Sequence, residues 1–119
     1  MEKNKGTVLV VEDEILIRMT AVDIITDAGY EVIEAANADE AIQILESRTD
    51  IRFIFTDIDM PGSMDGLKLA HAVRHRWPPV KIIVTSGHRH PCQDDLPQGG
   101  LFLNKPYSSS DVCRMLEAT

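Results

Sequence analysis

Carboxylates follow two apolar segments of this sequence, and their placement indicates chemistry at one edge of a sheet. Asp57 ends the apolar run 51–56, with Asp59 two residues later and a Met-Pro-Gly turn that cannot continue a strand. Glu12 and Asp13 follow the run 7–11 in the same way. A carboxylate at the carboxyl end of a buried strand lies where open α/β sheets place their ligands. The position of Asp57 therefore makes it a candidate nucleophile.

A hard cation suits this set of acids. Carboxylates crowded at one edge repel one another unless a cation neutralises them. Glu12, Asp13 and Asp57 offer only oxygen ligands, and Mg²⁺ is the natural choice because it needs few protein ligands and keeps several waters. The sequence therefore predicts a Mg²⁺ site.

An aspartate beside such an ion can accept a phosphoryl group and form an acyl phosphate. The transfer needs charge neutralisation around the moving group more than covalent assistance. Lys105 follows the last predicted strand and could supply a positive charge, while Thr85 or Ser86 could donate a hydroxyl to a phosphoryl oxygen.

The elements that position these residues alternate along the chain. Apolar and β-branched runs predict strands over 7–11, 30–35, 51–56, 81–85 and 101–103, and helical spacing predicts helices over 14–28, 37–47, 65–75 and from 108 onward. The segment 88–100 holds prolines and glycines without apolar periodicity, so we expect a loop with at most a short helix. Such alternation favours a parallel sheet with helices on both faces.

Length and charge restrict the class of protein. The 119 residues predict a single domain over 1–119, large enough for a core of its own. A net charge of −7 argues against direct nucleic-acid binding, which requires a concentrated basic surface. No apolar run has the length of a membrane helix, and no signal peptide is evident, so we expect a cytoplasmic protein that does not bind membranes.

Five sequence features carry a resemblance to a known family. In chain order they are Glu12-Asp13, Asp57, Met60-Pro61, Thr85 and Lys105-Pro106. Together they resemble the receiver domain of two-component response regulators, of the stand-alone single-domain type. The resemblance implies a flavodoxin-like, doubly wound sheet of five parallel strands in the order 2-1-3-4-5, with five helices of which the fourth could be stunted.

The resemblance also implies a function. A partner histidine kinase or phosphotransfer protein would phosphorylate Asp57, and the chain would be a phosphoacceptor that assists its own phosphorylation and dephosphorylation rather than an enzyme. Mg²⁺ would be held by Asp13, Asp57 and the backbone carbonyl of Asp59, with Glu12 acting through water.

Further roles follow from the same resemblance. Lys105 would contact the phosphoryl group, and the Lys105-Pro106 peptide bond would be cis. Thr85 and Phe102 would form a switch pair, in which Thr85 moves toward the phosphoryl group and Phe102 fills the space it leaves. The protein, a monomer or weak dimer, would then switch a protein-binding surface or relay the phosphoryl group to an unknown downstream partner.

Two features depart from the family pattern, and two other functions stay open. The loop from Met60 to Gly66 is one residue longer than usual, and the segment 88–100 is short of helix-forming residues. Asp57-Ile58-Asp59 also fits the nucleophile motif of haloacid-dehalogenase-like phosphohydrolases, although that motif normally follows the first strand of a larger domain. A pseudo-receiver that binds proteins without phosphorylation is the other alternative.

Overall fold

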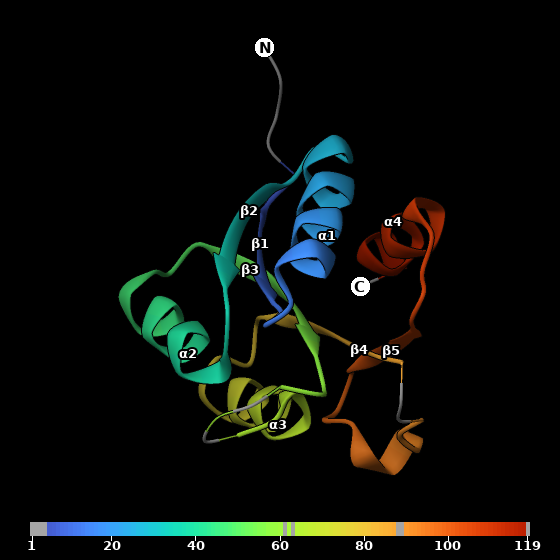
Figure 1. Cartoon of the computed structure of the whole chain (residues 1–119). Helices are drawn as coiled ribbons and strands as arrows, with labels where there is room; N and C mark the ends of the chain where they lie inside the picture. Colours follow the sequence, from blue (N-terminus) through green and yellow to red (C-terminus); the bar gives the residue numbers. More distant parts are fainter. Residues whose placement is uncertain (1–4, 61, 63, 88–89, 119) are drawn as a thin grey trace.

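Five parallel strands alternate with helices along the chain (Figure 1). The computed structural model describes residues 5–60, 62, 64–87 and 90–118. In chain order the elements are β1 (Thr7–Val11), α1 (Ile15–Asp27), β2 (Glu31–Ala35), α2 (Ala38–Ser47), β3 (Ile51–Asp57), α3 (Gly66–Arg76), β4 (Lys81–Ser86), the 3₁₀ turn η1 (Gln93–Asp95), β5 (Leu101–Asn104) and α4 (Ser109–Ala118). The strand order β2-β1-β3-β4-β5 confirms the predicted topology.

Helices cover both faces of the sheet, which explains why the central strands are apolar throughout. Figure 1 shows α1 and α4 on one face, with α2 and α3 on the other. Side chains alternate along β1, so Val8 packs toward α1 and α4 while Leu9 packs toward α2 and α3. Both are fully buried, and such burial contributes about 1.5–3 kcal/mol per large aliphatic side chain. The sheet therefore has one apolar core on each face, between the strands and the two helices that cover that face.

Polar side chains start three of the helices. Asn37 accepts a hydrogen bond from the backbone N–H of Glu40 before α2, and Asp65 accepts one from that of Lys68 before α3. At α4 the hydroxyl of Ser108 accepts from the N–H of Asp111. Each of these bonds satisfies a backbone N–H that has no partner within its helix.

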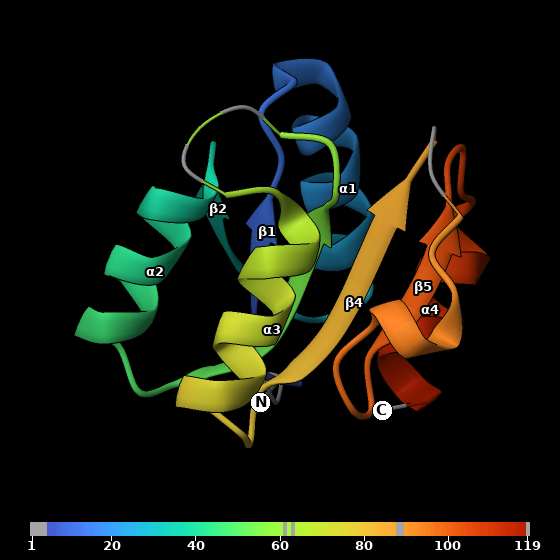
Figure 2. The same cartoon turned by 90° about the horizontal axis from the view of Figure 1, so that it is seen from below.

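A single 3₁₀ turn, η1, stands where the fourth of five helices was expected, so the described chain has four α-helices (Figure 2). Two side chains of α3 bind the backbone around this turn. His71 Nε2 donates to the carbonyl of Asp95 at 2.7 Å, and Arg74 Nε donates to that of Gln98 at 2.8 Å. These side-chain donors satisfy carbonyls that a helix would satisfy internally. Residues 88 and 89 of the segment lie outside the described residues.

Helix α1 buries only part of its apolar surface. Ala21 and Ile25 are buried against the sheet, whereas Ile15, Leu16 and Met19 are 62%, 78% and 53% exposed. The exposed side chains lie on the first turns of the helix, directly after the acids that end β1. The helix has 13 residues, and no helix in the described part of the chain is long and apolar enough to cross a membrane.

The first residue of α3 must be glycine. The Gly66 N–H donates to the carbonyl of Ile58 at 2.9 Å, so the helix begins against the end of β3. A Cβ at Gly66 would overlap the carbonyl oxygen of Asp57 and lie 2.8 Å from the Cα of Ile58. These neighbours are backbone atoms and cannot rotate away.

Gly66→Ala should therefore lower the free energy of unfolding by about 3 kcal/mol or more, the upper part of the range for overpacked sites. Urea unfolding followed by circular dichroism measures this loss. Gly87→Ala is the matched control, because its new methyl group would meet no atom closer than 3.6 Å. That control should stay within about 0.5 kcal/mol of the wild type. Equal stability of the two variants would contradict the prediction.

Candidate functional site

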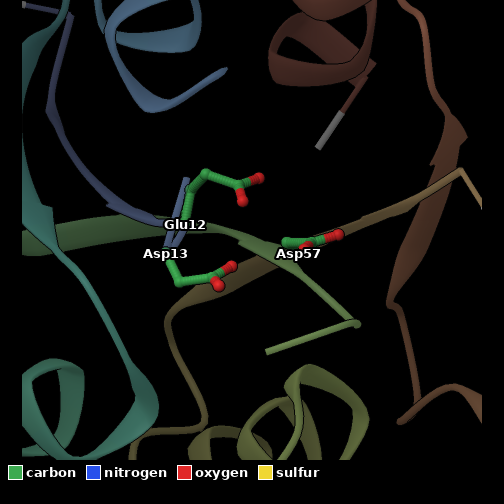
Figure 3. A group of neighbouring side chains, drawn as sticks. All are labelled: Glu12, Asp13 and Asp57. Atoms are coloured by element: carbon green, nitrogen blue, oxygen red, sulfur yellow. The ribbon is translucent and has the colours of Figure 1, made fainter. Parts of the chain in front are cut away.

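Three carboxylates meet at the carboxyl ends of two neighbouring strands (Figure 3). Glu12 and Asp13 follow β1 directly, and Asp57 is the last residue of β3. Because β1 and β3 run parallel and pair with each other, both bring their carboxyl ends to the same edge. One carboxylate oxygen of each residue lies within 4.8 Å of the others. The predicted convergence of these three acids is present in the structure.

Lys105 places its ammonium group between two of the acids. It follows β5, and its Nζ lies 2.9 Å from Glu12 Oε1 and 3.1 Å from Asp57 Oδ1. The Lys105-Pro106 peptide bond is cis. The lysine side chain is 18% exposed and both carboxylates are almost fully buried, so little water screens these ion pairs. Residues 93 positions apart in the sequence thus make direct contact.

Asp57 carries an unsatisfied acceptor. Its Oδ1 is buried and accepts no well-formed hydrogen bond among the described residues, although the Lys105 ammonium group lies 3.1 Å away. Burial raises the pKa of Asp57 above its ordinary value, although the charge of Lys105 opposes this and that of Asp59 adds to it. The environment therefore favours a positive partner for this oxygen.

The buried carboxylate of Asp57 affects the pKa values of both Glu12 and Lys105. Burial raises the pKa of Glu12, its hydrogen bond to Lys105 opposes that rise, and the neighbouring Asp57 reinforces it. Burial alone would lower the pKa of Lys105, but the bond to Glu12 and the charge of Asp57 outweigh burial and raise it. The lysine therefore stays charged at neutral pH.

These residues fit a divalent cation. Three carboxylates and one ammonium leave two negative charges uncompensated, and the orphaned Asp57 Oδ1 belongs to this cluster. All the donors are oxygens, the ligand type that Mg²⁺ prefers. Glu12, Asp13 and Asp57 would hold the ion, and Lys105 would balance part of the remaining charge.

The two hydroxyl residues at the end of β4, Thr85 and Ser86, have different surroundings. Thr85 pairs in register with Asp57 on the adjacent strand, and its side chain is buried. Ser86, a predicted phosphoryl-binding residue, donates a hydrogen bond to Asp59 Oδ2 at 2.8 Å. Asp59 was expected to act through its backbone carbonyl, and its side chain is bound to β4 by this bond.

Phe102 lies one strand farther out. In the sheet register it pairs with Val84, and the next residue, Leu103, pairs with Thr85. Thr85 and Phe102 thus lie one register position apart on adjacent strands, where successive side chains point to opposite faces of the sheet. The half-buried Phe102 ring meets the ring of His90 edge-on, with the centroids 6.3 Å apart. Pro61, part of the motif after Asp57, lies outside the described residues.

An apolar groove of about 410 Å³ opens beside Lys105. Its lining comprises Ile17, Thr20, Gly87, Lys105, Pro106 and Tyr107. The Tyr107 ring packs edge-on against Phe55, with centroids 5.6 Å apart, and burial raises its pKa to about 12. Tyr107 therefore stays neutral and forms an uncharged wall next to the lysine.

Sequence patterns did not reveal two residues around this site. The role of Tyr107 could have been suspected, because an aromatic residue directly follows Lys105-Pro106. Arg18 left no such signal. It sits on the second turn of α1, where arginine is common, yet its guanidinium donates to the backbone carbonyl of Glu12 at 2.9 Å.

Comparisons with known proteins agree with this geometry. Residues 8–117 match the family model of the response regulator receiver domain. Sensor kinase CckA of Brucella abortus is 37% identical over 120 residues, which cover 94% of this chain and 13% of that protein. Transcriptional regulatory protein PdtaR of Mycobacterium tuberculosis is 31% identical over 114 residues, which cover 92% of this chain and 54% of that protein.

A solved structure extends the agreement to three dimensions. The response regulator protein TrrA of Thermotoga maritima, determined in complex with Mg²⁺-BeF, superposes with a TM-score of 0.83 at 26% identity. The match covers 95% of this chain and 97% of that one. Matching sequence, strand order and acidic edge together lead to one conclusion: the chain belongs to the family of response regulator receiver domains of two-component systems.

Proposed function

We propose that Asp57 accepts a phosphoryl group from a phosphohistidine of a histidine kinase or phosphotransfer protein, in a reaction that depends on Mg²⁺. The observation that carries this proposal is the buried Asp57 Oδ1, which lacks a hydrogen bond among the described residues and lies 3.1 Å from Lys105 Nζ. The oxygen is therefore available as a nucleophile, beside a charge that can stabilise the incoming group.

The proposed step balances as a simple transfer. A carboxylate oxygen of Asp57 forms a bond to phosphorus while the P–N bond of the phosphohistidine breaks. The electron pair of that bond returns to the imidazole nitrogen of the donor, and the product is an aspartyl phosphate. Lys105 neutralises charge on the phosphoryl oxygens, and Thr85 donates its hydroxyl to one of them. The chain thus assists its own phosphorylation and, with water as the acceptor, its dephosphorylation, without being a turnover enzyme.

Bound Mg²⁺ would neutralise phosphoryl charge in addition to Lys105. Glu12, Asp13 and Asp57, together with the Asp59 carbonyl, are the proposed ligand set, with Glu12 acting through water. Support comes from the two uncompensated negative charges of the cluster and from TrrA, whose structure contains Mg²⁺-BeF.

The response is proposed to pass through β4 and β5. Thr85 would move toward the aspartyl phosphate, and Phe102 would move into the space that Thr85 leaves. The direct pairing of β4 with β5 at these positions supports a path from Thr85 to Phe102 through the paired backbones. The His90 ring, which contacts Phe102, would transmit the change to the surface. The resulting surface would bind a partner protein, or the phosphoryl group would be relayed onward.

The first turns of α1 are the proposed place of contact with the phosphodonor. The exposed side chains of Ile15, Leu16 and Met19 begin three residues after Glu12, beside the site, and exposed apolar groups of this kind mark interaction surfaces. We place the reaction in the cytoplasm, as a proposal that follows from the need for a donor kinase.

Incubation with acetyl phosphate and Mg²⁺ should add one phosphoryl group to the wild-type chain and none to Asp57→Asn. Intact-mass spectrometry measures the addition, and chelation of Mg²⁺ should reduce its rate by at least about tenfold. Asp50→Asn is the matched control, because Asp50 is an exposed acid that pairs with Arg48 away from the site. An unmodified wild type, or multiple turnover of p-nitrophenyl phosphate, would contradict the proposal.

Removal of the Asp57 charge should stabilise the metal-free protein. The pKa of Asp57 is raised in the folded state, so the folded protein holds this proton more tightly than the unfolded chain does. The stability that the proton contributes is complete at pH values below the unfolded-state pKa of Asp57, and it is lost as the pH rises through the folded-state pKa. Asp57→Asn is neutral at every pH and should raise the free energy of unfolding at pH 7 by on the order of 1 kcal/mol. Urea unfolding with and without Mg²⁺ measures the effect, and Mg²⁺ should narrow the difference. A less stable Asp57→Asn in metal-free buffer would refute this account.

Beryllofluoride, which imitates a phosphoryl group on aspartate, should shift the NMR signals of Phe102 and His90 in the wild type. In Thr85→Ala these shifts should fall to about half or less, because the moving hydroxyl that couples the site to β5 is absent. Amide signals of Glu12 and Asp13 should shift in both proteins, which shows that the ligand still binds. Equal Phe102 shifts in the two proteins would exclude Thr85 from the coupling.

A further inference from the structure

Arg18 joins the loop that carries the acids to the neighbouring strand β2. Its Nη1 donates to the backbone carbonyl of Glu12 at 2.9 Å, and its Nε donates to Glu34 Oε1 at 3.0 Å. The arginine side chain is only 18% exposed, whereas the Glu34 side chain is 49% exposed. One planar guanidinium therefore spans two acceptors in different segments of the chain, a geometry that suits arginine.

The bonded carbonyl belongs to the peptide that leads into Asp13. The N–H of Glu12 donates to the carbonyl of Ala35 at 3.1 Å, and the N–H of Glu14 donates to Glu12 Oε2 at 3.2 Å. With the bond from Arg18 Nη1, and a bond from the N–H of Arg18 to the carbonyl of Glu14 at 2.9 Å, the backbone from Glu12 to Glu14 takes part in four hydrogen bonds. Its orientation is thus set by hydrogen bonds with β2, with α1 and with the Glu12 side chain.

Asp13 depends on this backbone more than its neighbours do. Glu12 and Asp57 both contact Lys105, but no hydrogen bond or ion pair holds the Asp13 carboxylate among the described residues. Its position follows from the Glu12–Asp13 peptide and its own side-chain torsions. A tilt of that peptide would move the Asp13 oxygens away from the other carboxylates.

We propose that Arg18 is a positioning residue for the cation site, and that it acts by fixing the Glu12–Asp13 peptide while Glu34 orients its guanidinium. This inference rests on the proposed function, since it concerns affinity for Mg²⁺. Arg18 does not act by neutralising the acids, because it meets Glu12 through a neutral carbonyl and pairs its charge with Glu34.

Arg18→Lys tests the proposal, because it keeps the charge but removes the fork that bridges two acceptors. The dissociation constant for Mg²⁺, measured from amide NMR shifts of the full chain, should rise roughly tenfold, as is usual when a group that orients a metal ligand is lost. Glu34→Gln keeps an acceptor for Nε and should raise the constant less than about threefold. The variant that combines Arg18→Lys with Glu34→Gln should bind Mg²⁺ no more weakly than Arg18→Lys alone, because both changes disturb the same Arg18–Glu34 contact.

Two controls separate positioning from general loosening. Arg48→Lys alters an exposed arginine that pairs with Asp50, and Ile25→Val weakens the buried face of the same helix α1. Both should bind Mg²⁺ within about twofold of the wild type. Hydrogen exchange of the Glu14 amide should accelerate in Arg18→Lys and remain unchanged in Arg48→Lys.

The inference would be overturned if Arg18→Lys bound Mg²⁺ within twofold of the wild-type affinity. It would also be overturned if Ile25→Val lost as much Mg²⁺ affinity as Arg18→Lys. Neither result bears on Asp57. Conversely, a wild type that binds Mg²⁺ but gains no phosphoryl group from acetyl phosphate would overturn the proposed function and leave the role of Arg18 intact.

Discussion

The buried ion pairs of Lys105 with Glu12 and Asp57 are the interaction on which the site depends. Removing carboxylates from water is costly, and one ammonium group offsets only part of the mutual repulsion of three acids. The fold holds them in place because β1, β3 and β5 end at one edge and their backbones are fixed by the sheet. The site is thus preorganised but electrostatically incomplete. The uncompensated negative charge favours the binding of a divalent cation.

The rest of the structure serves this edge in two ways. Helices on both faces bury the strands, so the strand ends cannot shift without disturbing two cores. Local hydrogen bonds then orient the loops: Arg18 and Ala35 hold the backbone around Glu12, and Ser86 holds Asp59. Between β4 and β5, where a helix was expected, the side chains of His71 and Arg74 on α3 bind the backbone around η1. The surface next to Phe102 therefore differs from one built on a helix.

Much of this could be predicted from the sequence, because its signals are local. Continuous apolar runs marked strands buried on both faces, and their regular alternation with helical segments predicted the parallel sheet that the structure has. Since parallel strands share one direction, the acids after 7–11 and at 57 were expected at one edge of the sheet, and the pairing of β1 with β3 brings them together. Prolines and glycines between 88 and 100 likewise indicated a weak or absent helix, and η1 is the only helical turn among the described residues 90–100.

Tertiary structure decided how the side chains use that edge. The hydroxyl of Ser86 binds Asp59 across the ends of β3 and β4, a contact that no local sequence pattern indicated. Leu16 and Met19, on the first two turns of α1, are apolar but exposed. Arg18 gave no sequence signal, because its acceptors, a backbone carbonyl and Glu34, come together only in the folded chain. Sequence periodicity determines which face a residue takes within its own element. Contacts between side chains and distant backbone groups depend on how the elements pack, and only the folded structure contains that information.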